Sequence, residues 1–183
     1  MTHREIFETG VGGSDALKQV IDILAANGDY CLIGGMAINC YVEPVYTEDT
    51  DFAIAFDDKT KIKKTFKDAG IKVKDNRYDM SIFVPNSQLI IHITTDERYK
   101  NFGKDAKEHM LFDEFKVKVA SLENLIQAKT WCLEDSCRKA SKQFKDQADL
   151  CRIGENYPEL QNLLPKEIRI VLKEKSEEAG MEF

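Results

Sequence analysis

The sequence lacks the features that would place it in a membrane, in an oxidising compartment or along a nucleic-acid backbone. Its apolar runs are short, such as residues 89–91, whereas a membrane span needs about 20 residues. The five cysteines are odd in number and form no CxxC pair, which argues against a zinc site or a disulfide framework. Acidic residues outnumber basic ones, 32 against 26, so the net charge of −6 offers no general surplus for phosphate backbones. We therefore expect a cytoplasmic protein with reduced thiols and no membrane partner.

Signals for export, repeats and linkers are also scarce. The segment MTHREIFETGVGG at the N-terminus carries charges and no apolar stretch of the kind that a secretory signal requires. Only four prolines are present, and no stretch rich in proline, glycine or serine separates one part from another. Hydrophobic residues make up 43% of the chain and charged residues 32%, which is typical of folded proteins. The sequence predicts one domain of ordinary size with a helical appendage.

The hydrophobic pattern predicts an α/β (α+β) fold, with a mixed sheet flanked by helices over residues 1–120. Residues 121–183 are expected to form a helical segment that packs on this core. In the core, apolar spacing and turn residues predict a helix at 14–27 capped by Ser14, a strand at 30–33, a short helix after it, a strand at 50–56, a helix from Asp58 to Ala69, a strand near 71–73, a hairpin from 78–84 and 88–94, and a strand at 115–119 paired with 109–112. In the helical segment we expect helices from 122 and over 138–154, and a final helix begun by Pro165 and frayed from Ser176.

Two glycines directly follow the predicted buried strand at 30–33. Gly34 and Gly35 have no side chain, so a turn built from them allows a phosphate group to approach the backbone closely. The helix expected after them would present unpaired N–H groups and the positive end of its dipole. By itself a glycine pair after a strand usually marks only a turn, so its significance depends on the residues that follow.

An acidic pair stands at the start of the next predicted strand. Asp49 and Asp51 are two residues apart, and alternation along a strand that begins at Asp49 places both carboxylates on one face. Two carboxylates held together repel each other unless a cation lies between them. Hard oxygen ligands of this kind suit Mg²⁺ with bound phosphates. An isolated Asp-x-Asp is more often a solvated acidic rim, so the pair needs support from the rest of the sequence.

The helical segment carries a second group of charged residues. Lys129 lies near the inward apolar stripe of its helix, where an ammonium group needs a partner. Asp146 and Asp149 are three residues apart and share one face of the next helix. Two alternative interpretations stay open. The Lys129 stem could run along the core toward water, and the aspartates could pair with Lys142 or Lys145 on a solvated face.

In this order and spacing, the motifs resemble those of the nucleotidyltransferase superfamily related to DNA polymerase β. The superfamily motif is Gly-Gly or Gly-Ser followed at a short interval by Asp-x-Asp, and here residues 36–48 separate Gly35 from Asp49. The run at 47–51 is similar to the Thr-x-Asp-x-Asp form of the AbiEii-type branch and of small antibiotic nucleotidyltransferases. The Lys…Arg…Lys-Asp-x-x-Asp pattern of that branch is similar to the charged residues Lys129, Arg138, Lys145, Asp146 and Asp149. The resemblance covers residues 14–155.

This resemblance implies a nucleotidyltransferase-like fold and the transfer of a nucleoside monophosphate from a triphosphate such as ATP to an acceptor hydroxyl. It implies that Asp49 and Asp51 hold Mg²⁺ (or Mn²⁺) and are catalytic together with Lys129. The residues that it assigns to nucleotide binding are Gly34, Gly35, Lys129, Lys145 and Asp146. Acceptors in the resembling families include RNA ends, proteins and aminoglycoside-like small molecules, and the net charge of −6 mildly favours a small or cationic acceptor.

The sequence departs from the superfamily pattern at one position. The superfamily usually has a third carboxylate on a later strand beside the Asp-x-Asp, and in this sequence His92 occupies that place. Imidazole is a poor general base toward a hydroxyl next to Mg²⁺, so this position bears directly on turnover. Asp79 and Asp96 are the nearby carboxylates that could substitute for the missing one.

Three hypotheses about function follow from the sequence. The first is an active nucleotidyltransferase. The second is a catalytically degenerate nucleotide- or partner-binding module on the same fold, with an antitoxin-like protein partner in a toxin–antitoxin-like system. The third is an α/β interaction domain in which the Asp-x-Asp has no chemical role. Pyrophosphate release separates the first from the second, and Mg²⁺-dependent nucleotide binding separates both from the third.

Overall fold

The computed structural model describes residues 13–47, 49–55, 58–178 and 180. The chain divides into two compact units, Met1–Ser121 and Leu122–Phe183, and each is described by itself. Some positions used in the sequence predictions, namely the N-terminal segment to residue 12, Glu48, and Phe56 at the expected end of a strand, lie outside the described residues.

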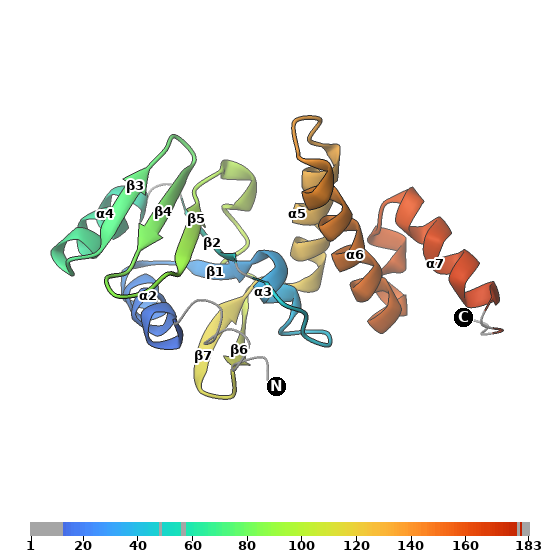
Figure 1. The fold of residues 1–183 in the computed structure, drawn as a ribbon, viewed down its shortest axis with the longest axis horizontal. Coiled ribbons are helices and arrows are strands. Elements are labelled where there is room, and N and C mark those ends of the chain that lie inside the picture. The colour runs from blue at the N-terminus through green and yellow to red at the C-terminus, as the bar shows by residue number, and fades with distance from the viewer. Residues whose placement is uncertain (1–12, 48, 56–57, 179, 181–183) are drawn as a thin grey trace. The chain divides into compact units, whose positions relative to one another are not determined.

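The first unit is built on a mixed seven-stranded sheet with the strand order β3-β4-β5-β2-β1-β7-β6. Its strands are β1 (Tyr30–Ile33), β2 (Thr50–Ile54), β3 (Lys72–Asp75), β4 (Asp79–Phe83), β5 (Ile90–Thr94), β6 (Lys107–Leu111) and β7 (Phe115–Val119). Strand β2 runs antiparallel to β1 and parallel to β5, whereas β1 runs parallel to β7. The predicted mixed α/β core is confirmed, and the acidic strand β2 lies at the centre of the sheet (Figure 1).

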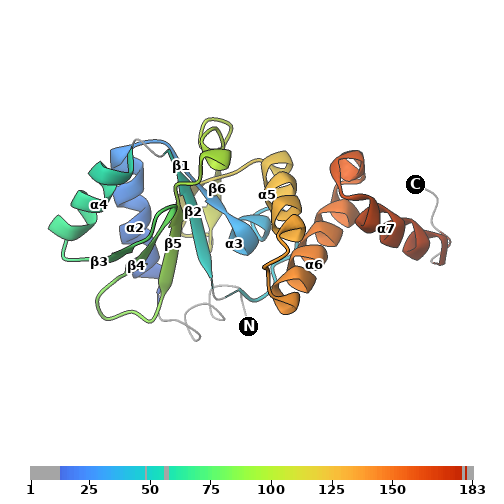
Figure 2. The ribbon, with the colours of Figure 1, turned by 90° about the horizontal axis from the view of Figure 1, so that it is seen from above.

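Helices cover this sheet on both faces. Helices α2 (Ser14–Asn27) and α4 (Lys59–Asp68) contact each other and lie together on one face, and α3 (Gly34–Ile38) lies on the other (Figure 2). The apolar positions that recur at helical spacing in α2 are buried, as their pattern predicts: Leu17, Val20, Ile21 and Leu24. Burial of this stripe is what stabilises α2, since a helix of 14 residues is marginal by itself.

The ends of the helices differ from the predicted caps. Ser14 is the buried first residue of α2, and the cap position belongs to Gly13. Asp58 does occupy the cap position of α4, but its carboxylate makes no capping hydrogen bond. Ala69 is exposed rather than inward, because α4 ends at Asp68 and Gly70 then takes a left-handed φ of 75°.

Two hairpins form the flanks of the sheet. The predicted turn between β4 and β5 is confirmed, with Asn86 at a φ of 61° and the Leu89 N–H donating to the Ser87 hydroxyl at 3.0 Å. Strands β6 and β7 also pair antiparallel, around Phe112 and Asp113 with φ of 55° and 57°. Between the hairpins, the polar segment after β5 contains the short 3-10 helix η2 (Glu97–Tyr99).

The second unit is helical, as predicted. It contains α5 (Leu122–Glu134), α6 (Ala140–Asn156), the 3-10 helix η3 (Pro158–Leu163) and α7 (Lys166–Glu178). The sequence did not indicate η3. The predicted fraying from Ser176 is wrong: Ser176 is buried within α7, and its hydroxyl donates to the Leu172 carbonyl at 3.1 Å. No helix in the described ranges is long and apolar enough to cross a membrane.

Candidate active site

The glycine turn and the acidic strand meet at the end of β1. Gly34 follows β1 with a φ of 73°, a left-handed conformation that favours glycine. Ile33 and Asp51 are register partners across β1 and β2, so the Asp51 side chain lies beside the turn. A Cβ placed on Gly34 would be 2.7 Å from Asp51 Oδ2. The absence of a side chain at position 34 therefore allows the Asp51 carboxylate to lie directly against the backbone of the turn.

Replacing Gly34 with alanine should destabilise the protein by about 1–3 kcal/mol, because an L side chain is strained at this φ and the new Cβ displaces the Asp51 carboxylate. The measurement is urea denaturation followed by circular dichroism. Gly70→Ala is the matched control, since Gly70 has a φ of 75° and, among the described atoms, nothing within 4 Å of the added Cβ. Equal losses in both variants would show that contact with Asp51 contributes nothing.

The helix after the glycine turn is too short for its dipole to attract a phosphate group strongly. Helix α3 has five residues, Gly34–Ile38, which is less than two turns. The macrodipole expected from the sequence is therefore small, and the close approach of the backbone at Gly34 and Gly35 is the main basis for phosphate binding at this turn. Their assignment to nucleotide binding stays a prediction.

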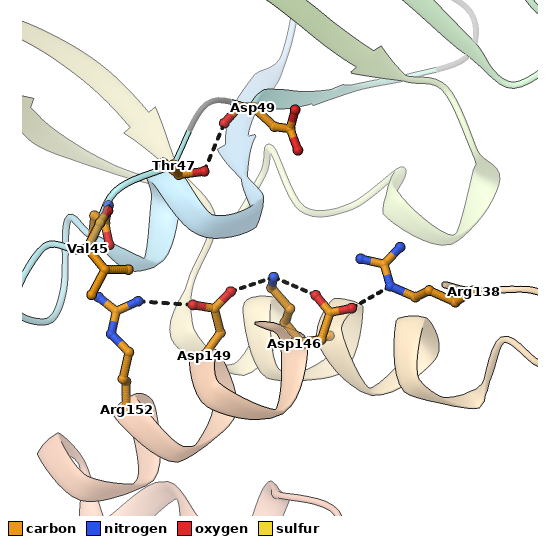
Figure 3. A network of polar contacts seen from close by, with 9 residues as sticks. Val45, Thr47, Asp49, Arg138, Asp146, Asp149 and Arg152 are labelled. Carbon is orange, nitrogen blue, oxygen red and sulfur yellow. Dashed lines mark hydrogen bonds and ion pairs between the residues drawn. The ribbon is translucent and has the colours of Figure 1, made fainter. Parts of the chain in front are cut away.

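Asp49 lies just before β2 rather than at its first position. The strand begins at Thr50, and Asp49 is half-buried. The buried Thr47 donates its hydroxyl to the Asp49 carbonyl at 3.4 Å, which ties down the backbone at this point (Figure 3). The strict alternation assumed from the sequence starts one residue later than expected, so the convergence of the Asp49 and Asp51 carboxylates stays a prediction.

His92 lies opposite Asp51 on the adjacent strand, at the register position expected for a third carboxylate. On its other side it pairs with Ser81, whose hydroxyl is 3.4 Å from His92 Nδ1. Cross-strand partners share one face of a sheet, so Asp51, His92 and Ser81 form a row across three strands. The three side chains combine one carboxylate, one imidazole and one hydroxyl.

The two carboxylates considered as substitutes for His92 lie toward the other end of the strands. Asp79 pairs with Thr94, which is level with Ala53 rather than Asp51. Two residues along a strand correspond to roughly 6.6 Å, and β4 is also separated from β2 by β5. Asp96 follows β5 at that same end, where Arg98 holds it in an ion pair at 2.8 Å and lowers its pKa by hydrogen bonding. Neither carboxylate occupies the position beside Asp51.

A chain of ion pairs joins α5 and α6 within the helical unit (Figure 3). Lys129 Nζ lies 2.8 Å from Asp146 Oδ1 and 2.6 Å from Asp149 Oδ2. Arg138 binds the second oxygen of Asp146, and Arg152 binds Asp149 at 3.0 Å. Exposures of 8%, 1% and 2% for Lys129, Asp146 and Asp149 exclude the solvated face considered above. The Lys129 ammonium is paired as its inward position predicts.

The ionisation of Lys129 follows from these contacts. Burial by itself lowers the pKa of a lysine, but the charges of Asp149 and Asp146 and their hydrogen bonds outweigh it and raise the Lys129 pKa above 10.5. Lys129 therefore stays an ammonium ion at neutral pH. Two of its three N–H donors are directed at carboxylates.

Arg152 was not predicted from the sequence, and Arg138 was predicted only through the resemblance. The signal for Arg152 was its spacing of three residues from Asp149, which places both side chains on one face of α6. Lys145 is half-buried on the same helix, beside Asp146 in the sequence. The contribution of Lys129, Lys145 and Asp146 to nucleotide binding stays a prediction.

The residues beside the turn fit a divalent cation only together with a nucleotide. Within the described part of the chain, no cluster of three or more His, Cys, Asp or Glu side chains could hold a metal ion. Mg²⁺ usually takes one or two carboxylates and completes its octahedron with water and substrate phosphates. Carboxylates at Asp49 and Asp51 match that pattern, whereas the imidazole of His92 does not add a hard oxygen ligand.

Comparisons with known proteins identify the fold. No family model and no curated protein matches the sequence. Among solved structures, a candidate nucleotidyltransferase from H. pylori is similar over 97% of this chain and 78% of its own, with a TM-score of 0.55 and 15% identity. A candidate nucleotidyltransferase from Thermotoga maritima is similar over 79% of this chain and 94% of its own, with a TM-score of 0.52 and 16% identity.

A third similar structure has a ligand of known chemistry. ANT(2″)-Ia, solved in complex with adenylyl-2″-tobramycin, is similar over 87% of this chain and 96% of its own, with a TM-score of 0.57 and 12% identity. At these identities the similarity establishes the fold and not the activity. The chain has the fold of nucleotidyltransferases, as the resemblance of its motifs predicts.

Proposed function

We propose, from the nucleotidyltransferase fold shared with these structures, that the chain binds a nucleoside triphosphate such as ATP with Mg²⁺ or Mn²⁺ and transfers a nucleoside monophosphate to an acceptor hydroxyl. The acceptor oxygen bonds to the α-phosphorus, the bond to the pyrophosphate oxygen breaks, and the hydroxyl proton passes to solvent. The observation that carries the proposal is the Asp51 carboxylate against the Gly34 turn, at the start of the central strand. Because this arrangement needs a glycine at a strained φ, an ordinary acidic rim does not explain it.

The roles of the residues follow from their chemistry. Asp49 and Asp51 would hold the divalent ion, which neutralises charge on the phosphate oxygens during transfer. Gly34 and Gly35 would let the triphosphate approach the backbone. Lys129, kept protonated by Asp146 and Asp149, would donate its remaining N–H to a phosphate oxygen.

The proposal is tested by thermal shift with each of the four triphosphates, with and without Mg²⁺ or Mn²⁺. At one hundred times the Kd, binding should stabilise the folded protein by about 2.7 kcal/mol. Metal-dependent stabilisation by one or more triphosphates, followed by pyrophosphate release with a panel of small cationic molecules, RNA ends and proteins as acceptors, would support the proposal. Stabilisation by none of them would favour the plain interaction domain.

A second function is favoured by one observation, the imidazole of His92 opposite Asp51. A neutral imidazole cannot bridge two Mg²⁺ ions as a carboxylate does, and an imidazolium repels them. A protein that kept nucleotide binding and lost turnover would serve as a binding module, with an antitoxin-like protein as its partner.

The His92→Asp variant distinguishes the two functions. If the natural protein is the binding module, wild type should bind nucleotide without releasing pyrophosphate, and the variant should gain release at least tenfold above background, because it restores the third oxygen ligand. If the natural protein is the enzyme, wild type should already release pyrophosphate. Ser81→Ala is a matched control, since it removes the hydroxyl beside His92 Nδ1 without adding a carboxylate.

A further inference from the structure

One buried side chain hydrogen-bonds to the backbone in the middle of the loop that carries Asp49. We call residues 39–47 and Asp49, in the connection from α3 to β2, the arch loop. The Asn39 amide donates from Nδ2 to the Val45 carbonyl at 2.7 Å, and its Oδ1 accepts from the Val45 N–H at 3.2 Å. Asn39 is 7% exposed and also continues α3, with its own N–H donating to Gly35 O at 3.1 Å. The same residue thus joins the glycine turn to the middle of the arch loop.

The two ends of the arch loop are fixed by other contacts. At its start, the Tyr41 hydroxyl donates to the Ala120 carbonyl at 2.9 Å. The His109 ring packs edge-on against Tyr41 with 4.5 Å between ring centroids and hydrogen-bonds to the Cys40 backbone. At its end, the buried Thr47 donates to the Asp49 carbonyl. The contacts at both ends therefore hold the backbone of the loop where it leaves α3 and where it reaches β2.

Apolar burial does not hold the middle of the arch loop. Val45 and Tyr46 are 43% and 48% exposed, although both are large hydrophobic residues that normally pack inward. The two hydrogen bonds from the Asn39 amide therefore hold the backbone at an exposed part of the loop. A buried amide that exchanges two hydrogen bonds with the N–H and C=O of one residue imitates a strand partner, and losing it removes both bonds from Val45.

We infer that Asn39 is a positioning residue for the acidic pair, an inference that rests on the proposed function. The Asn39 amide holds the backbone at Val45, four residues before Asp49. Thr47 lies between them, and its hydroxyl holds the Asp49 carbonyl, so the two contacts together position the Asp49 backbone. Without the amide, the Asp49 carboxylate samples more positions relative to Asp51, and a cation held by both is bound more weakly. Asn39 touches neither the cation nor the nucleotide in this inference and acts only through the arch loop.

The first test measures the arch loop without any ligand. Tyr46 is an exposed chymotrypsin site, so cleavage after it reports opening of the loop below the unfolding temperature. Asn39→Ala should raise the cleavage rate about tenfold, since both hydrogen bonds to Val45 are lost. Asn27→Ala is the matched control: the Asn27 amide donates to the Ile23 carbonyl at 2.7 Å at the end of α2, and β1 and α3 separate it in the chain from the arch loop. Equal cleavage in both variants would overturn the inference.

The second test measures the effect on the cation. Binding of Mn²⁺ in the presence of a non-hydrolysable nucleotide is followed by electron paramagnetic resonance. Asn39→Ala should raise the Kd of Mn²⁺ about tenfold relative to wild type, and Asn27→Ala should leave it unchanged. A purely structural role would lower the melting temperature of both variants without moving the Mn²⁺ Kd, and that result contradicts the inference. If wild type itself binds no Mn²⁺–nucleotide, the proposed function fails, and the role of Asn39 fails with it.

Discussion

Asp51→Asn should lower the rate of pyrophosphate release about a thousandfold while the sheet stays folded. Asparagine has the shape of aspartate, so it fits beside Gly34, but it lacks the charge that holds a divalent ion and offsets phosphate repulsion. Strand β2 keeps its register partners Ile33 and His92 in the variant, and we expect its melting temperature to stay within a few degrees of wild type. The measurement is coupled pyrophosphate detection with the triphosphate and acceptor that wild type prefers.

Asp75→Asn provides the matched control for this substitution. Asp75 lies on the edge strand β3, where ion pairs with Lys59 and Lys63 lower its pKa through hydrogen bonding. An exposed ion pair of this kind contributes less than about 1 kcal/mol, so both stability and turnover should change little. Retention of more than a tenth of the wild-type rate by Asp51→Asn would remove Asp51 from the catalytic assignment.

Lys129→Met should destabilise the helical unit by about 3 kcal/mol. The substitution leaves the carboxylates of Asp146 and Asp149 almost fully buried, each with a single arginine partner. Urea denaturation followed by tryptophan fluorescence measures the loss directly, because Trp131 is the single tryptophan of the chain and lies on α5 in this unit. Lys173→Met is the matched control, since Lys173 is an exposed lysine of α7 paired with Glu177.

The same pair of proteins tests the pKa of Lys129. Its folded-state pKa is raised, because the nearby carboxylates outweigh burial, so its contribution to stability is fully present below pH 10.5. That contribution is lost only as the pH rises through the folded-state value. The difference in unfolding free energy between wild type and Lys129→Met should therefore be constant from about pH 7 to 9 and shrink above about pH 10.5. A difference that already closes below pH 9 would mean that Lys129 is not held by these carboxylates.

The sequence predicted those elements that depend on residues close to one another in the chain. The stripe of α2, the turn at Asn86 and the glycines after β1 each depend on residues within a few positions of one another. The resemblance also placed His92 on a strand beside the Asp-x-Asp, which agrees with its register against Asp51. The helical phase of Lys129 indicated only that its ammonium needs a partner, because a buried ammonium without one is too costly, and the sequence left open which residue that partner is.

The features that the sequence did not reveal depend on how a loop turns back on itself and on packing between elements. Nothing near Asn39 indicates that its amide pairs with Val45, because the chain must first turn back on itself. Two wrong predictions, the Ser14 cap of α2 and the fraying of α7 from Ser176, have a similar origin. Burial against other elements fixes both residues inside helices, and it outweighs the local preference of serine for caps and frayed ends.

The central place of β2 also sets the order in which the first unit can fold. The hairpins β4–β5 and β6–β7 join neighbouring residues, so they can form early. Strand β2 must instead enter between β1 and β5, and the closure of β1 against β7 brings Leu32 to Val119 across most of the unit. Contacts so distant in sequence form slowly, because the entropy of loop closure opposes them until the sheet is nearly complete. We therefore expect a partly folded chain to hold both hairpins before β2 is paired on both of its edges.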